Sequence, residues 1–138
     1  MKTGSYAEYN KIKNRVYLYL EGFHDLEEAE RMKGEYKKAI EKCNPGFTVL
    51  ADVSKYRPGS PEVQKVHAEA AKMAADAGVK KVARVVGETP LGGMQIDRIA
   101  KTEGHYPSAH FVTMEEAEAY LDRDKGGLKN EWGVYSSR

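Results

Sequence analysis

The chain has 138 residues, of which 41% are hydrophobic and 31% charged, and its formal net charge is +1. These values fit one folded domain and exclude an intrinsically disordered chain, while the balanced charge disfavours nucleic acid as a partner. No apolar run of about 18 residues is present, so we expect neither a membrane span nor a secretion signal. The single cysteine, Cys43, excludes an internal disulfide and suits a reducing cytoplasm.

The N-terminal part of the chain predicts a β-hairpin followed by a helix. Residues Tyr6 to Ile12 and Val16 to Leu20 are β-prone, and Lys13-Asn14 between them suits a tight turn. Asp25 is a good N-cap, and the glutamates after it complement the helix dipole. Apolar residues at helical spacing then predict a helix to about Cys43, with its apolar stripe facing the sheet.

A buried strand and a second helix follow. Phe47 to Val53 is a mostly apolar run bounded by turn residues, which is typical of a central strand. Ser60 then supplies an N-cap before Pro61, and apolar residues at helical spacing continue to Gly78. His67 lies beside this apolar stripe, where we expect a polar flanking residue.

The last part of the chain repeats the alternation of strand and helix. Its predicted elements are a strand over Lys80 to Val86, a turn-rich loop over Gly87 to Gly93, a helix over about Met94 to Thr102, a strand over Ala109 to Val112, and a helix that begins with a capping box between Thr113 and Glu116.

The order ββαβαβαβα predicts an α/β fold with a mixed central sheet of about five strands and about four helices. The N-terminal hairpin supplies the antiparallel part of this sheet. Residues 1–123 then form a single domain, and residues 124–138 form a C-terminal tail. In the tail, an apolar cluster that includes Trp132 follows Gly126-Gly127. The tail therefore either docks, on this domain or on a second copy in a homodimer, or frays.

Several segments spread along the chain carry a family resemblance. They are Val16 to Gly22, Pro45 to Ser54, Lys81 to Val86 and Phe111 to Ala117. Together they resemble the SpoIIAA-like proteins, bacterial relatives of the STAS domain, and the similarity extends from about Asn10 to Arg123. The resemblance implies a STAS-like fold and a regulatory, non-catalytic role as a protein-interaction module.

STAS domains are commonly switched by phosphorylation of a serine at the start of the helix after an Asp-x-Ser strand end. Here the strand end is Asp52-Val53-Ser54, and the nearest serine is Ser60, which stands in Gly59-Ser60-Pro61 instead of the family's Asp-Ser-Ser-Gly. Both a phosphoacceptor and a plain N-cap stay open for Ser60. The resemblance places a partner surface around Ser54, Tyr56, Arg57 and Ser60.

A second function is open, because a related fold carries lipids in Sec14-type proteins. The alternative is a carrier or sensor of a small amphipathic or anionic ligand. Ligands of open parallel sheets usually bind beyond the carboxyl ends of the strands. The candidate residues for such a crevice are His24, Asp52, Arg84, Thr89, Gly92 and Gly93.

These crevice residues also have simpler structural interpretations. Asp52 and Ser54 suit a local turn, and the glycine-rich loop lacks the known phosphate-binding motifs. Arg84 interrupts an apolar strand, so it either lies at an edge or solvent-facing position or pairs with Asp52 or a bound carboxylate.

No residue pattern predicts a catalytic centre, a metal site or a cofactor. The four histidines lack metal-binding spacing, and neither GxSxG nor paired carboxylates occur. Cys43 has no histidine nearby in sequence, so we expect a buried structural thiol. We therefore expect a protein without enzymatic activity.

Overall fold

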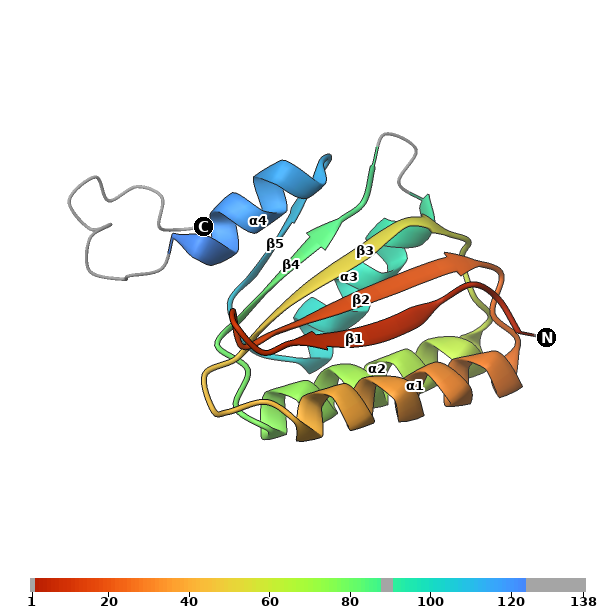
Figure 1. Cartoon of the computed structure of the whole chain (residues 1–138). Helices are drawn as coiled ribbons and strands as arrows, with labels where there is room; N and C mark the ends of the chain where they lie inside the picture. The colour runs from red at the N-terminus through yellow and green to blue at the C-terminus, as the bar shows by residue number, and fades with distance from the viewer. Residues whose placement is uncertain (1, 88–90, 124–138) are drawn as a thin grey trace.

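Five strands pair in their order along the chain, as the computed structural model, which describes residues 2–87 and 91–123, shows (Figure 1). The hairpin strands β1 and β2 are antiparallel, and the remaining pairs are parallel. The predicted mixed α/β sheet with four helices is thus confirmed. The elements are β1 (Tyr6–Asn10), β2 (Arg15–Gly22), α1 (Leu26–Glu41), β3 (Thr48–Tyr56), α2 (Pro61–Asp76), β4 (Lys81–Val85), α3 (Leu91–Glu103), β5 (Ser108–Phe111) and α4 (Met114–Asp122).

The strand order decides where the helices lie. Each parallel strand is added on the same side of the one before it, so crossovers of one hand place α1, α2 and α3 on one face of the sheet. α2 packs between α1 and α3, and α4 covers β3, β4 and β5 from the opposite face (Figure 1). Within the described sheet the strand order never reverses, so it has no switch-point crevice of the kind that doubly wound sheets use for ligands.

Helices α1, α2 and α4 begin where their capping residues predict. The side chain of Asp25 accepts a hydrogen bond from the amide of Glu28, and Ser60 caps α2 in the same way ahead of Pro61. Thr113 and Glu116 form the expected capping box at the start of α4. Over residues 2–87 and 91–123, every helix is too short or too polar to cross a membrane.

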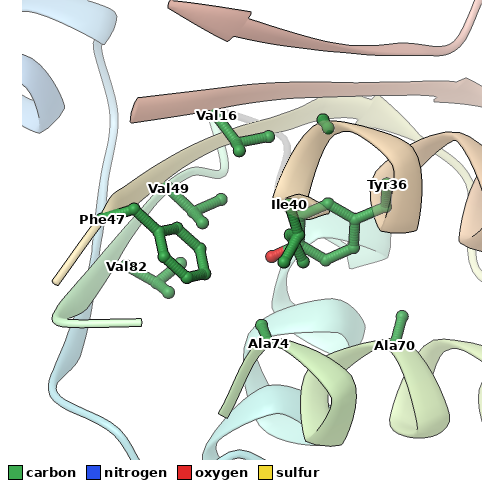
Figure 2. Packing of buried hydrophobic residues seen from close by; sticks show 9 residues of the cluster. Val16, Tyr36, Ile40, Phe47, Val49, Ala70, Ala74 and Val82 are labelled. Carbon is green, nitrogen blue, oxygen red and sulfur yellow. The ribbon is translucent and has the colours of Figure 1, made fainter. Parts of the chain in front are cut away.

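The core forms because side chains alternate between the two faces of the sheet. Val16, Val49 and Val82 are neighbours on β2, β3 and β4 and point toward the three-helix layer. There they pack with side chains of α1 and α2 that include Tyr36, Ile40, Ala70 and Ala74 (Figure 2). On the other face, Leu50, Ala83 and Val85 pack against Ala117 and Leu121 of α4.

α4 is also held by a buried cation. The Arg15 side chain of β2 is 4% exposed, and its guanidinium pairs with Glu118 and, at 3.0 Å, with Asp122. The hydroxyl of Tyr17 donates to the same Glu118 carboxylate at 2.7 Å. These bonds fix the position of α4 across the end of the sheet.

The structure moves several predicted boundaries, and β3, for example, continues to Tyr56 instead of ending at Val53. β1 ends at Asn10 instead of Ile12, because the connection to β2 is a four-residue turn in which Asn14 adopts a positive φ of 52°. α3 begins at Leu91 instead of Met94 and takes in Gly92 and Gly93, which we expected in a loop. These glycines let α3 approach the sheet, since a methyl group added at Gly92 would lie 1.8 Å from the carbonyl oxygen of Tyr56.

This close approach predicts opposite effects for two glycine substitutions in helices. Gly92→Ala is expected to lower the free energy of unfolding by about 2 to 3 kcal/mol, because the backbone has to shift. Gly34→Ala on exposed α1 surface meets no atom within 4 Å and is expected to raise it by about 0.5 to 1 kcal/mol. Urea denaturation of both variants measures the difference. Equal effects would contradict the packing role of Gly92.

Candidate functional site

A cavity of about 60 Å³ lies between the sheet and the three-helix layer. Four of its lining residues are alanines, so the helices and β3 leave space that larger side chains would fill. Lys33 and Ile99 are half-buried lining residues, and Lys33 pairs with Glu69 at 2.7 Å. The lining consists of Leu18, Leu20, Met32, Lys33, Tyr36, Val49, Ala51, His67, Ala70, Ala71, Val82, Arg84, Ile96, Ile99, Ala100 and Tyr106.

Arg84 forms a buried ion pair in the wall of this cavity. Its side chain is 2% exposed, and Nε donates to a carboxylate oxygen of Asp97 on α3 at 2.8 Å. An Nη atom donates to the Ser108 hydroxyl at 2.6 Å, and Lys101 approaches the other oxygen of Asp97 to 3.2 Å. Burial alone would raise the pKa of Asp97, but the hydrogen bond and charge of Arg84 outweigh it and hold the pKa below its usual value.

This arrangement corrects the expectations for Arg84. The residue is neither at an edge nor facing solvent, because β4 lies between β3 and β5 and Arg84 points into the interior. Its partner is not Asp52. Arg84 stands opposite Ala51 in the register, so Asp52 lies on the other face of β3.

A second polar group consists of His24, Tyr56 and His67, which we call the histidine–tyrosine cluster. The ring centroids of His24 and His67 are 5.6 Å apart, and Tyr56 lies 5.2 Å from His24 and 5.5 Å from His67 with its ring nearly perpendicular to both. His24 is fully buried, Tyr56 is 4% exposed, and His67 also lines the cavity. Three buried atoms, His24 Nδ1, the Tyr56 hydroxyl and His67 Nε2, have no hydrogen-bond partner among the described residues.

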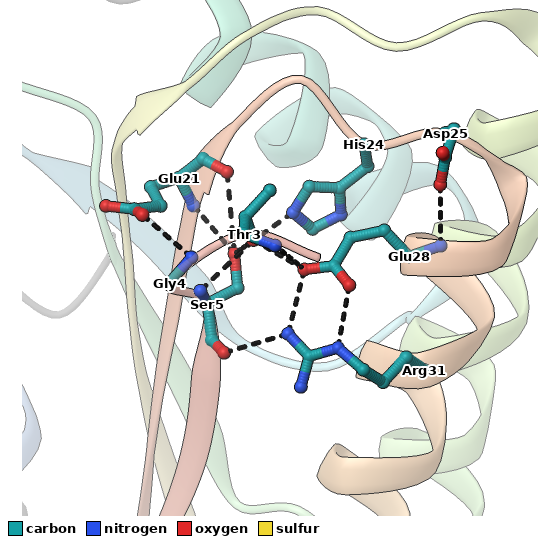
Figure 3. A network of polar contacts seen from close by, with 8 residues as sticks. All are labelled: Thr3, Gly4, Ser5, Glu21, His24, Asp25, Glu28 and Arg31. Carbon is teal, nitrogen blue, oxygen red and sulfur yellow. Dashed lines mark hydrogen bonds and ion pairs between the residues drawn. The ribbon is translucent and has the colours of Figure 1, made fainter. Parts of the chain in front are cut away.

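A network at the N-terminus sets the proton position of His24 (Figure 3). The Thr3 hydroxyl donates to the Glu28 carboxylate, which has no proton to share. The Ser5 hydroxyl lies 2.6 Å from Thr3 Oγ1 and 3.5 Å from the carbonyl oxygen of Glu21, so its one proton goes to one of these oxygens and it accepts from His24 Nε2 at 3.1 Å. His24 is therefore protonated on Nε2, and its unpartnered Nδ1 is a free acceptor.

The titratable groups of this region keep fixed charges near neutral pH. Burial and the neighbouring His24 lower the pKa of His67 to about 4, and burial lowers the pKa of His24 as well. The hydrogen bonds from Arg31, at 2.7 and 2.8 Å, and then those from Thr3 lower the pKa of Glu28 to about 2 despite burial. The histidines are thus neutral, and Glu28 is a carboxylate neutralised by Arg31.

The structure does not gather the predicted crevice residues at one place. His24 belongs to the histidine–tyrosine cluster and Arg84 to a separate ion pair, while Gly92 and Gly93 pack against Tyr56 and Val86. Asp52 accepts from the amide and hydroxyl of Ser54 at 3.1 and 2.7 Å, which is a local interaction. Thr89, like the tail from 124 to 138, lies outside the described residues.

The predicted partner surface is also divided. Tyr56 is buried and does not lie at the surface, because its ring packs between His24 and His67. Ser60 is half-buried and uses its hydroxyl to accept from the Val63 amide at 3.3 Å. Arg57 is exposed and Ser54 is half-buried.

Sequence analysis missed His67 and Asp97 as interior residues. Helical spacing contained the signal for both. His67 is four residues after Val63 and three before Ala70, and Asp97 is three before Ala100, so each shares a face with buried residues. Because of its polar character, His67 was predicted to flank the apolar stripe, and Asp97 was not singled out at all.

Among the described residues, no group of three or more His, Cys, Asp or Glu side chains is placed to hold a metal ion. Cys43 is half-buried, and burial raises the pKa of its thiol. No family model and no curated protein sequence matches the chain. The similarity to SpoIIAA-like proteins therefore stays a proposal.

The ion pair predicts a strong asymmetry between single and double substitution. Asp97→Ala leaves a buried guanidinium without its carboxylate and is expected to lower the free energy of unfolding by about 3 to 5 kcal/mol. Replacing both partners, Arg84→Met with Asp97→Leu, is expected to remain within about 2 kcal/mol of the parent. Chemical denaturation of the variants tests this. A harmless Asp97→Ala change would show that Arg84 has another counter-charge.

The low pKa of His67 predicts acid sensitivity. In the unfolded chain His67 has the ordinary histidine pKa of 6.5, whereas in the folded chain its pKa is about 4. Stability is therefore expected to fall by about 2 to 3 kcal/mol as the pH drops between these values. Protonation of Glu28 lowers the stability in a more acidic range, between the ordinary glutamate pKa of 4.5 and its pKa of about 2 in the folded chain.

His67→Phe separates this contribution from the others. Denaturation curves of the parent and the variant, measured from pH 7.5 to pH 3.5, should converge as the pH falls, with the variant losing less stability. Parallel curves over this range would mean that His67 titrates normally in the folded protein.

Proposed function

We propose that the chain is a non-catalytic module that binds a small, largely apolar molecule in the cavity between the sheet and the three-helix layer, as a carrier or sensor. The observation that carries this proposal is the cavity itself. His67 lines the cavity and belongs to the histidine–tyrosine cluster, whose three buried polar atoms have no partner among the described residues. Binding sites for small molecules are commonly hollow and apolar with a few convergent polar groups.

The cavity carries an energetic cost when it is empty. At about 24 cal/mol per Å³, a volume of 60 Å³ corresponds to about 1.4 kcal/mol of lost packing. Each buried polar group without a partner costs about 1 to 3 kcal/mol more. A ligand that fills the space and bonds the polar atoms recovers both, and this difference favours the bound state.

The volume limits the size of the occupant. A cavity of about 150 Å³ holds benzene, so 60 Å³ accommodates a molecule smaller than benzene or one end of a longer molecule. The half-buried lining residues are Leu18, Lys33, His67, Ile99 and Tyr106, so a longer ligand would leave the interior past one of these side chains.

A protein-interaction module is the second candidate function. Its support is a set of exposed apolar side chains that follow the carboxyl ends of β2, β4 and β5, the edge at which the resemblance to SpoIIAA-like proteins places a partner surface. These side chains are Phe23, Leu26, Leu91, Val112 and Met114. We place it second because Tyr56 is buried and the Ser60 hydroxyl is engaged in capping α2.

Xenon tests whether the cavity admits an apolar guest. Dissolved xenon is expected to shift the methyl NMR signals of Ala51, Ala70, Ala71 and Ala100, because an atom of this kind enters dry apolar cavities. Ala71→Leu fills the space and should abolish the shifts, and Ala71→Val is the smaller alternative if leucine overpacks the core. Ala75→Leu is the control, since Ala75 lies on the same helix and lines no part of the cavity.

Native mass spectrometry of protein purified from its own host tests for a natural occupant. The parent and Ala75→Leu should carry an added small-molecule mass that denaturation releases, and Ala71→Leu should not. A protein partner that stays bound to chains carrying no small molecule would favour the second candidate function. Absence of xenon shifts together with bare chains in every variant would refute the cavity as a binding site.

A further inference from the structure

We infer that the histidine–tyrosine cluster binds a single hydroxyl group, so that the ligand is a small uncharged alcohol and not a carboxylate or phosphate. This inference rests on the proposed function and specifies its ligand class. Its basis is the set of three buried polar atoms that have no partner in residues 2–87 and 91–123 and belong to rings in mutual contact.

Buried polar atoms without a partner are rare in folded proteins, and here three occur in one cluster. His24 is fully buried and Tyr56 is 4% exposed, so bulk water does not satisfy them. The three rings come from the segment after β2, from the end of β3 and from α2. Separate elements thus bring three rings with unpartnered polar atoms into contact beside the cavity that His67 lines, which indicates a missing hydrogen-bonding group.

The hydrogen positions specify that group. His24 Nδ1 accepts only, because the Ser5 hydroxyl donates elsewhere and holds the His24 proton on Nε2. The missing group must therefore donate to Nδ1. It can also accept from the Tyr56 hydroxyl. A hydroxyl group donates and accepts, whereas a carboxylate or phosphate dianion only accepts and an ammonium only donates.

The charges around the cluster also exclude an anion as the ligand. Both histidines are neutral near pH 7, and Glu28 beside them is already neutralised by Arg31. In the cavity lining, Arg84 is held by Asp97 and Lys33 by Glu69. A bound anion would lose its hydration without gaining a counter-charge, which is costly in an apolar interior.

The experiment compares two probes of equal chain length, 1-propanol and the propanoate ion. Imidazole nitrogens are observed by long-range ¹H–¹⁵N NMR near pH 7.5. In the free protein, His24 should show a protonated Nε2 and a free-base Nδ1. 1-Propanol should move the Nδ1 signal upfield, and propanoate should bind at least about tenfold more weakly.

Tyr56→Phe is the decisive variant. It keeps the ring and removes one hydroxyl, so 1-propanol affinity should fall about fivefold. Because the hydroxyl has no partner among the described residues, the melting temperature of the ligand-free variant should not decrease. Tyr6→Phe, which changes an exposed tyrosine on β1, is the matched control and should leave affinity unaltered.

Each other outcome identifies which idea has failed. Propanoate binding as tight as that of 1-propanol would overturn the hydroxyl assignment, and so would an unaltered 1-propanol affinity in Tyr56→Phe. In both cases, entry of xenon would still support the cavity as a binding site. A Nδ1 signal that is already upfield and insensitive to 1-propanol would identify a permanent structural water and overturn the assignment as well. Failure of both 1-propanol and xenon to bind would remove the proposed function itself.

Discussion

The one-directional order of the strands is the constraint on which the rest of this structure depends. Because β2, β3, β4 and β5 are added side by side without reversal, their crossover helices all lie on one face. That face acquires a closed layer of three helices, and the space beneath them becomes the interior of the protein. This order leaves no crevice at the strand ends of the described sheet, while a site between the sheet and the three helices becomes possible.

Within this interior the protein treats its buried polar groups in two ways. Arg84 with Asp97 and Glu28 with Arg31 are paired at hydrogen-bond distance, so their charges are neutralised and their positions are held. His24, Tyr56 and His67 are brought together, and one polar atom of each has no hydrogen-bond partner in the part of the chain that the structure describes. The paired groups are sufficiently explained by folding. The unpaired cluster is not, and this contrast supports the proposal that another molecule binds there.

Local signals predicted the fold well because they act over a few residues. The caps at Asp25, Ser60 and Thr113 mark the helix starts correctly, since each side chain bonds an amide three residues ahead. The same reasoning misplaced the start of α3. Gly92 looks like a loop residue in sequence, and only the backbone of β3 facing it explains why a helix needs glycine there.

The sequence by itself determined the order of strands and helices, the hairpin and the starts of α1, α2 and α4, because periodicity and capping are properties of neighbouring residues. Only the tertiary structure decided the partner of Arg84 and the meeting of His24, Tyr56 and His67, which are far apart along the chain. It also decided that alanines on separate elements enclose a cavity. Such contacts depend on how the faces of distant elements are oriented in three dimensions, and no local pattern in the chain encodes that orientation.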